Sequence, residues 1–193
     1  MKKFFSLLLV MLFELSAFAS SDDVVVRSGD AKSIAIKGIT INVVFDYTGS
    51  QIYDMKEKQY YAVSDYIKMK GEEWERDFPS ELKKAEDAFI EEFNEDSKKA
   101  VFAVNSDNAK FTLTFKLKDF SYGKAVVWSS KDRAWGSGVL EVVNNETRDT
   151  VVVFEFTKVD GKTAAGIGQM ELRREECYEH VAEALAKLLN KKK

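Results

Sequence analysis

The sequence has few of the residues that most often carry covalent chemistry: its 193 residues include one cysteine, one histidine and one proline. The cysteine, Cys177, has no disulfide partner within the chain, which leaves pairing between molecules as the one route to a disulfide. It lies far from the N-terminus, so it cannot be the lipid-bearing cysteine of a lipoprotein signal. Because Cys177 falls on the apolar face of a helical pattern, we expect a buried thiol that packs as a small hydrophobe and no lipid anchor.

The single histidine, His180, has no nucleophile near it in the sequence, and base catalysis on a hydroxyl or thiol needs such a pair. It lies between Glu176 and Glu183 on a predicted helix, where we expect it to be exposed. No acid–base pair stands out among the 32 acidic residues. The sequence therefore predicts a protein that is not an enzyme.

The glycine motifs that bind phosphates are incomplete. Residues 161–163 copy the Gly-Lys-Thr end of a P-loop, but the residue five places before Gly161, where that loop needs a glycine, is Phe156. Residues 166–168 begin a dinucleotide fingerprint, but Glu171 replaces its third glycine. The turn 105–108 lacks the spaced acidic ligands of a calcium loop. We expect no cofactor and no metal, and the sequence leaves open whether the glycine-rich loop binds anything.

An excess of positive charge is also missing. Lysine and arginine number 29 against 32 acidic residues, which gives a formal net charge of -3. Nucleic-acid binding needs a basic surface, so we expect no nucleic-acid partner. The one basic run, Lys191 to Lys193, ends the last predicted helix, where positive charge suits the helix dipole.

The apolar run at the N-terminus is too short to span a bilayer. It follows a basic start and covers residues 4–13, and small residues at Ala17 and Ala19 form a cleavage pattern. We predict a signal peptide over 1–19, a flexible lead-in over 20–31 and a single domain over 32–193. The mature chain is then exported to the periplasm or the extracellular space, with no transmembrane segment.

The centre of the chain alternates apolar and polar residues, as a strand does when it buries one face. In the strand predicted at 109–118 the apolar positions are Phe111, Leu113, Phe115 and Leu117, and the polar ones are Thr112, Thr114, Lys116 and Lys118. The alternation slips near Asp119, which indicates a bulge or a strand end. Further strands are expected at 39–45, 101–104, 139–143 and 151–157, with residues 33–37 pairing beside the first.

Two amphipathic helices complete the pattern. Pro79 suits a first helical turn, so Asp77-Phe78-Pro79 predicts the start of a helix of about seventeen residues. A second helix is expected at about 170–190, with an inner face of Cys177, Val181, Ala184, Leu185 and Leu188. The order of elements predicts an α+β two-layer sandwich: a mixed sheet of about four to five strands with two helices packed on one face. Which parts of the other face are exposed stays open.

The segment 51–77 is the least regular part, and we expect one short helix in it. Long connections inside a small domain often carry function. Its aromatic side chains, with one from a later connection, are the candidate surface for a partner or ligand: Tyr53, Tyr60, Tyr61, Tyr66, Trp74 and Trp135. The simpler interpretation, which we favour, is that these rings fasten the segment to the sheet, since aromatic residues bury large areas.

Four stretches resemble a family of small exported proteins from Bacteroidetes whose function is not established: VFDYTGSQI, WERDFPSEL, FIEEFNEDSKKAV and SGVLEVVN. More distantly, the order of elements is similar to the two-layer envelope domain of the TolB N-terminus. The resemblance implies a role in docking other envelope proteins, and it carries no catalytic residues.

Together these patterns favour a non-catalytic binding or scaffold module that acts through protein–protein contacts in the cell envelope, with envelope proteins or a second copy of the chain as partner. The alternative is a carrier of a small molecule that uses the aromatic segment 51–77. A closed apolar pocket of a few hundred Å³ would favour the carrier, and an exposed apolar patch would favour the module.

Overall fold

The computed structural model describes residues 23–124, 133–161 and 170–191. These residues form eight strands, three α-helices and one short 3-10 turn. The strands are β1 (Val24–Gly29), β2 (Thr40–Asp46), β3 (Gln51–Asp54), β4 (Gln59–Ala62), β5 (Val101–Ala103), β6 (Phe111–Ser121), β7 (Trp135–Asn144) and β8 (Thr150–Asp160). The helices are α1 (Val63–Lys70), α2 (Glu72–Asp96) and α3 (Met170–Asn190), and the 3-10 turn η1 spans Ala31–Ser33.

All eight strands belong to one mixed sheet. Six of them follow the order β1-β8-β7-β6-β2-β5, and the β3–β4 hairpin is attached to β6 through β3. Strand β2 runs parallel to β5 and β6, whereas β6, β7, β8 and β1 pair antiparallel. The α+β class is therefore confirmed, but the expected number of strands was too low.

The three strands that the sequence did not predict are short or begin in polar surroundings. Strand β1 lies within the segment 20–31 that we expected to be a flexible lead-in, and it pairs with β8 instead. Strands β3 and β4 have four residues each, too few for a clear alternation. Residues 33–37 form no strand; Ser33 belongs to η1, where the Asp30 side chain accepts from Lys32 N at 3.0 Å.

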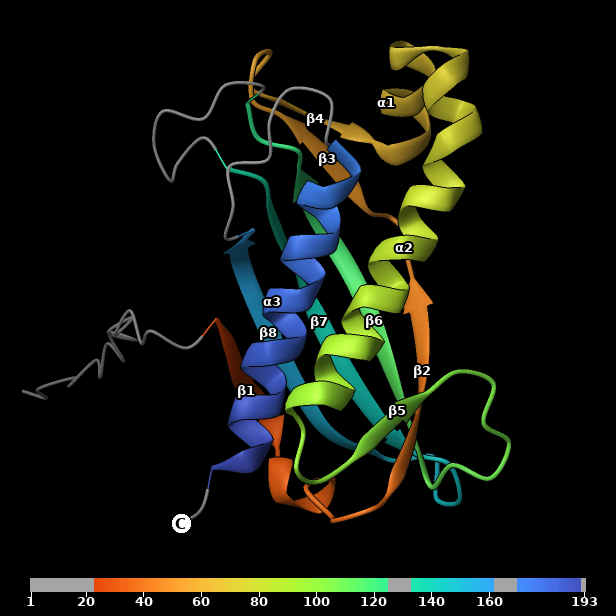
Figure 1. The fold of residues 1–193 in the computed structure, drawn as a ribbon, viewed down its shortest axis with the longest axis vertical. Helices are drawn as coiled ribbons and strands as arrows, with labels where there is room; N and C mark the ends of the chain where they lie inside the picture. The colour runs from red at the N-terminus through yellow and green to blue at the C-terminus, as the bar shows by residue number, and fades with distance from the viewer. Residues whose placement is uncertain (1–22, 125–132, 162–169, 192–193) are drawn as a thin grey trace, which may run out of the picture.

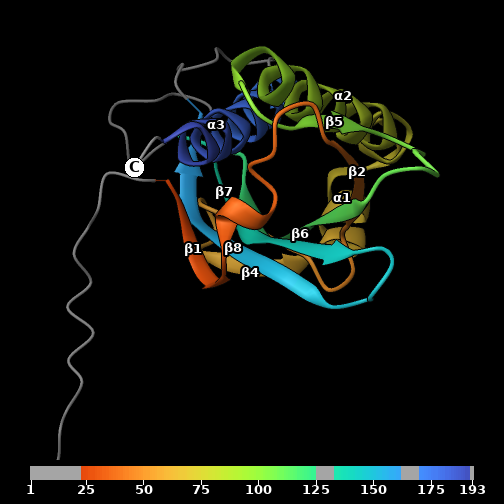
Figure 2. The same cartoon turned by 90° about the horizontal axis from the view of Figure 1, so that it is seen from below.

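The two long helices lie side by side on one face of the sheet, as expected (Figures 1 and 2). The rings between the layers form a continuous cluster in which Phe115 of β6 meets Phe89 of α2 at 5.1 Å and Tyr178 of α3 at 4.7 Å between centroids. The predicted slip at the end of β6 is also confirmed, since the pairing with β7 shifts between Leu117 and Asp119. The sheet curves around the helices, so its outer face points away from them (Figure 2).

Helix α2 begins earlier than predicted. It starts at Glu72 after Gly71, whose φ of 100° ends α1, and Pro79 lies inside it. Proline in a helix interior removes one backbone hydrogen bond. Pro79 is exposed, so water can satisfy the freed carbonyl. The proline therefore did not mark the start of the helix.

Two asparagines fasten the ends of these layers. The Asn94 side chain of α2 accepts from Phe102 N at 2.7 Å and donates to Phe102 O at 3.0 Å, so it closes the outer edge of β5 as a neighbouring strand would. The Asn190 side chain at the end of α3 accepts from Lys98 N at 2.9 Å and donates to Asp96 O at 2.8 Å. The last turn of α3 is thereby tied to the turn after α2.

Candidate functional surface

The β3–β4 hairpin organises most of the aromatic side chains singled out in the sequence. Its turn is closed by Asp54, which is 7% exposed and accepts from the backbone N–H groups of Lys56 at 2.8 Å and Glu57 at 3.0 Å. Burial alone would raise the pKa of Asp54, but these N–H groups and Lys70 outweigh it, and the pKa lies below its usual value. The hairpin is thus held in one shape by its own carboxylate.

Successive residues of a strand point to opposite faces, so the hairpin divides its rings into two sets. On the inner side, Tyr61 of β4 meets rings from other elements, and together they form the inner set: Tyr61, Tyr66 of α1, Trp74 of α2 and Tyr122, which follows β6. Tyr66 is 4% exposed, and its ring lies 5.9 Å from Trp74 and 6.4 Å from Tyr122 between centroids. This inner set fastens the hairpin and α1 to the body of the protein.

The other set, which we call the outer row, lies on the opposite side of the hairpin. It consists of Tyr60, Tyr53 and Trp135 with Lys158 at its end. The rings of Tyr60 and Tyr53 are 4.9 Å apart, those of Tyr53 and Trp135 are 6.0 Å apart, and the Lys158 ammonium lies 5.2 Å from the Trp135 ring. The row therefore crosses the sheet from β4 to β8.

Small residues on the intervening strands let the outer row close. Ser121 of β6 pairs with Trp135, and its hydroxyl donates to Tyr53 O at 2.9 Å. Because Ser121 is fully buried and short, the rings of β3 and β7 meet above it. Ser137 of β7 accepts from Lys158 N at 2.9 Å, at a position where Lys158 has a φ of 51°. This local turn of β8 brings the lysine over the tryptophan ring.

A buried charged cluster lies behind the inner set, where α3 begins to pack on the sheet. Arg174 is 1% exposed, its Nε lies 2.9 Å from Glu81 Oε1, and its Nη2 donates to the Tyr122 hydroxyl at 2.6 Å. The Nε–H is not aligned with the carboxylate, so the 2.9 Å contact is an ion pair rather than a directed hydrogen bond. Phe120 and Phe78 cover the guanidinium at 4.5 and 4.8 Å.

The electrostatics of this Arg174 cluster suit a structural role. Burial alone would lower the pKa of Arg174, but Tyr122 and Glu81 more than offset it and raise the pKa. Burial raises the pKa of Tyr122 far above its usual value, so the hydroxyl keeps its proton and donates to Glu81 Oε1 at 2.7 Å. The charge is held by fixed partners and faces no open space that a substrate would enter.

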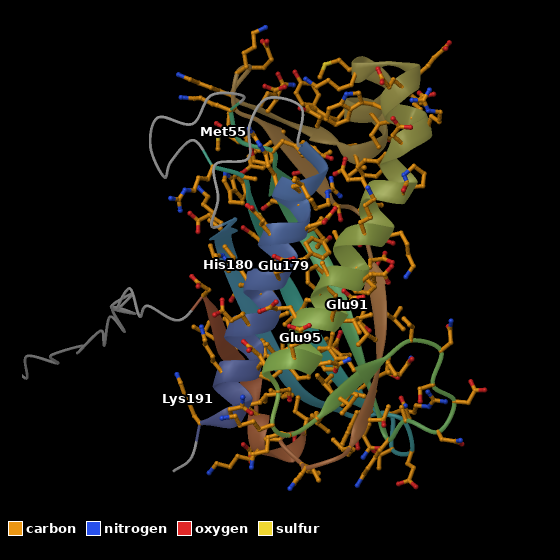
Figure 3. The ribbon with its side chains drawn as sticks, viewed as in Figure 1. Met55, Glu91, Glu95, Glu179, His180 and Lys191 are labelled. Carbon is orange, nitrogen blue, oxygen red and sulfur yellow. The ribbon has the colours of Figure 1, made fainter. Side chains whose placement is uncertain are left out.

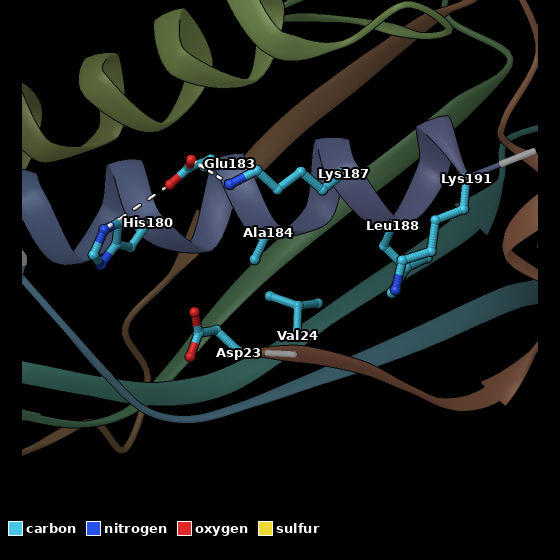
Figure 4. A pocket seen from close by; sticks show the side chains of 8 residues that line it. All are labelled: Asp23, Val24, His180, Glu183, Ala184, Lys187, Leu188 and Lys191. Atoms are coloured by element: carbon cyan, nitrogen blue, oxygen red, sulfur yellow. Dashed lines mark hydrogen bonds and ion pairs between the residues drawn. The ribbon is translucent and has the colours of Figure 1, made fainter. Parts of the chain in front are cut away.

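His180 does not lie on the exposed flank of α3, where we expected it. Its side chain is 12% exposed, and Nδ1 donates to the carbonyl oxygen of Asp160 at the end of β8. Nε2 lies 3.9 Å from Glu183 Oε2 (Figure 4). The corrected position joins α3 to β8.

A small cavity of about 110 Å³ lies between α3 and the start of β1, as Figure 4 shows. Its walls include Asp23, His180, Glu183, Lys187 and Leu188. It lies along the lower part of α3, whereas the hairpin with Met55 at its tip stands at the other end of the molecule (Figure 3). The aromatic residues predicted to line a ligand pocket do not surround this cavity.

Two other side chains have structural roles. Cys177 is 1% exposed, and burial raises the pKa of its thiol, which confirms the buried, inert cysteine. Asn145, which begins a glycosylation sequon, accepts from Thr112 Oγ1 at 2.9 Å and donates to Ala109 O at 2.6 Å. Residues 162–168 of the glycine-rich loop lie outside the described residues.

The six predicted aromatic residues therefore come together, but in two sets rather than one. Tyr61, Tyr66 and Trp74 belong to the inner set, and Tyr53, Tyr60 and Trp135 to the outer row. Sequence reasoning missed Tyr122 and Lys158, which complete the two sets, as well as the Arg174 cluster. The alternation within QYYA of β4 was the available signal for the division, since neighbouring tyrosines on a strand must face opposite ways.

No protein-family model matches the chain, and no curated protein matches it in sequence. Among solved structures, it is similar to the PelC dodecamer from Paraburkholderia phytofirmans, with 12% identity, a TM-score of 0.43, and coverage of 84% of this chain and 98% of PelC. A PelC variant from the same organism gives 12% identity and a TM-score of 0.39, over 84% of this chain and 97% of that one. A DUF330 protein from Xanthomonas campestris gives 12% identity and a TM-score of 0.39, over 78% and 82% of the two chains.

These likenesses are too weak to transfer an assembly or a function to this chain. The resemblance to an exported Bacteroidetes family and to the TolB N-terminal domain stays a prediction. Within residues 23–124, 133–161 and 170–191, no helix is long and apolar enough to cross a membrane. The same residues contain no group of three or more His, Cys, Asp or Glu side chains arranged to hold a metal ion.

Proposed function

We propose that the protein is an exported, non-catalytic binding module that acts through protein–protein contacts in the cell envelope, with the outer row as its contact surface. The observation that carries this proposal is the arrangement of Tyr60, Tyr53 and Trp135 on the outer face of the sheet. Tyr60 is 44% exposed and Tyr53 is half-buried, whereas Trp135 is 8% exposed and supports the other two rings. Export rests on the signal peptide predicted for residues 1–19.

The chemistry of the outer row suits a protein partner. Tyrosine and tryptophan, with arginine, dominate the binding energy of many protein interfaces, because each combines a large apolar area with a polar end. The row stands on the paired strands β3, β6, β7 and β8, so its rings are fixed before binding and lose little conformational freedom. Lys158 and the ion pair between Arg133 and Asp160 at 3.2 Å supply a polar margin.

The alternative, a small-molecule carrier, needs a pocket of roughly 300–1,000 Å³ lined by the aromatic residues. The cavity beside α3 measures about 110 Å³, and no ring of the outer row lines it. The rings contact one another instead. The described residues therefore favour the binding module over the carrier.

The test compares three forms of the exported chain, residues 20–193, each carrying the same tag and each added to the native envelope. The forms are the wild type, Tyr60→Ser, and the control Val104→Ser, which replaces a side chain that is 48% exposed outside the outer row. We expect the wild type and the control to recover the same protein through a series of salt washes. The Tyr60→Ser form should lose it, and binding of the purified partner should weaken about tenfold or more.

Two results would contradict the proposal. If the wild-type protein is recovered without any partner at every salt concentration, a docking role is excluded, whichever surface would carry it. Equal recovery of one partner by all three forms would support a docking role but place it elsewhere on the molecule.

A further inference from the structure

The two ends of the six-strand path of the sheet differ in how their outer edges are finished. At β5 the Asn94 side chain bonds both backbone groups of Phe102, which leaves that edge closed to another strand. Strand β1 pairs with β8 on one side, and within the described residues no side chain bonds its backbone on the other side. Figure 2 shows β1 at the margin of the sheet. An unpaired edge strand offers a row of N–H and C=O groups to a further strand.

The open edge also carries exposed apolar side chains. Val25 is 41% exposed and Val26 is 43% exposed, although both belong to a paired strand. The regular part of β1 ends at a bulge between Val26 and Ser28, so only a short stretch can receive a partner. The edge therefore suits a short, two-stranded contact and excludes a long sheet extension.

The sequence of β1 is complementary to itself in one antiparallel register. With Val25 placed opposite Val25 of a second copy, Val24 meets Val26, and Asp23 comes opposite Arg27, the residue in the bulge, so that the charges pair through their side chains beyond the regular strand. Opposite charges that face each other across two strands stabilise the pair, and like charges destabilise it. A parallel arrangement would place Asp23 beside Asp23, and a shift of one residue centred on Val24 or Val26 would leave one of the charges facing a valine.

The side chains that this register needs are accessible. Arg27 is 60% exposed at its side chain and lies 3.5 Å from Glu155 on the same strand pair, so part of its guanidinium remains open to solvent. Asp23 is exposed. We infer that a second copy of this chain adds its β1 strand antiparallel to β1 of the first, forming a two-fold symmetric dimer with paired Asp23 and Arg27 side chains. This interface is independent of the outer row.

Because the strand contact is short, the dimer is a weak one that depends on concentration. Two of its features can be tested separately: the two-fold position of Val25, and the charge pairing. Both tests use the exported chain, residues 20–193, since the described residues all lie within it. The buried Cys177 does not compete in thiol chemistry.

The first test is disulfide formation. Val25→Cys places two thiols against each other across the two-fold axis, whereas the control Val44→Cys places an equally exposed thiol, at 44% for the native valine, on β2. Mild oxidation at increasing protein concentration should cross-link the Val25→Cys form into a dimer well before the control. Equal cross-linking of both variants would show random collision and would overturn the proposal.

The second test is sedimentation across a concentration series with charge variants. Arg27→Glu and Asp23→Lys each turn two attractions into two repulsions, and we expect each to weaken the dimer about tenfold or more. The double variant with both changes restores opposite pairing and should restore the dimer. Circular dichroism shows whether each form is folded. A monomeric wild type at all concentrations, or single variants that dimerise as the wild type does, would overturn the proposal.

Discussion

The two sides of the β3–β4 hairpin carry similar side chains in opposite situations. On the inner side, Tyr66 is 4% exposed and is surrounded by rings from α2 and from the end of β6. On the outer side, Tyr60 is 44% exposed and touches one neighbouring ring, that of Tyr53. The comparison shows that residue type does not decide exposure here: Tyr66 and Tyr60 lie on opposite sides of the hairpin, and Trp135 on the outer side is itself 8% exposed.

The same division extends to charge. The inner side encloses an ion pair between Arg174 and Glu81, whereas the ion pairs of the outer side, such as Lys116 with Glu141 at 2.5 Å, remain in contact with solvent. Buried pairs lose hydration and depend on their partners, and exposed pairs are screened by water. We therefore expect substitutions on the inner side to change stability and those on the outer side to change binding.

The largest effect is expected from Arg174→Met. The change leaves Glu81 and the Tyr122 hydroxyl without their buried cation, and breaking a buried ion pair in this way costs about 3–5 kcal/mol. Urea denaturation measures the loss. The control Arg76→Met removes an arginine that is 71% exposed and bonded to Asp77, and should cost at most about 1 kcal/mol. Equal losses in the two variants would contradict the contrast between buried and exposed ion pairs.

Tyr66→Ala should cost slightly less, about 3 kcal/mol, because it removes a buried ring and leaves a cavity between α1, Trp74 and Tyr122. Thermal unfolding followed by circular dichroism gives the change in stability. A loss below about 1 kcal/mol would mean that the inner rings do not hold the hairpin in place.

A smaller effect, of opposite sign, is expected from Glu179→Gln on α3. Burial raises the pKa of Glu179, and Glu92 and Glu176 raise it further. The folded protein therefore binds the proton more tightly than the unfolded chain, so the native glutamate destabilises the fold increasingly as the pH rises through its raised pKa. Because Glu179 is half-buried and solvent still screens part of this repulsion, we expect a gain on the order of 0.5 kcal/mol at neutral pH.

Urea denaturation at several pH values measures how the gain in stability of Glu179→Gln depends on pH. It should disappear at acidic pH, where the glutamate is protonated in both the folded and the unfolded chain. The control Glu91→Gln removes the same charge from an exposed position on α2 (Figure 3). If the gain in stability instead grows toward low pH, the pKa of Glu179 is lowered in the folded protein and not raised.

The smallest effect on stability is expected from Tyr60→Ser, within about 0.5 kcal/mol, since the ring is largely exposed. If thermal unfolding shows a loss comparable to that of Tyr66→Ala, the outer row is part of the structural framework, and its exposure gives no reason to treat it as a contact surface.

The sequence predicted the long, regular elements well. Strand β6, its slip near Asp119 and α3 follow from periodicity over ten or more residues. The β7–β8 hairpin was also predicted, but β7 begins at Trp135, so that this ring lies in a strand and not in the expected connection. The start of α2 was wrong because an exposed Pro79 is tolerated inside a helix, which no local pattern reveals. Strand β1 was missed because its three valines owe their conformation to pairing with β8, more than a hundred residues later.

The candidate surface was predicted in composition but not in arrangement. Tyr53, Tyr60 and Trp135 were grouped with three other aromatic residues as one candidate surface. The contact between Tyr53 and Trp135 depends on Ser121, which no pattern in the sequence marks as important. Arg174 lies in a charged run of α3 and reads as a surface residue, and only its position against Glu81 and Phe120 shows that it is buried. Long-range packing, which periodicity does not encode, decided both cases.

The two hydrogen bonds from the Asn190 side chain to the backbone of Asp96 and Lys98 fix the position of the end of the described chain. A fluorescent or spin label attached at Lys191 would therefore depart from a rigid origin. Distances measured from it to a second label on the hairpin tip would report how the two ends of the molecule move relative to each other when a partner binds.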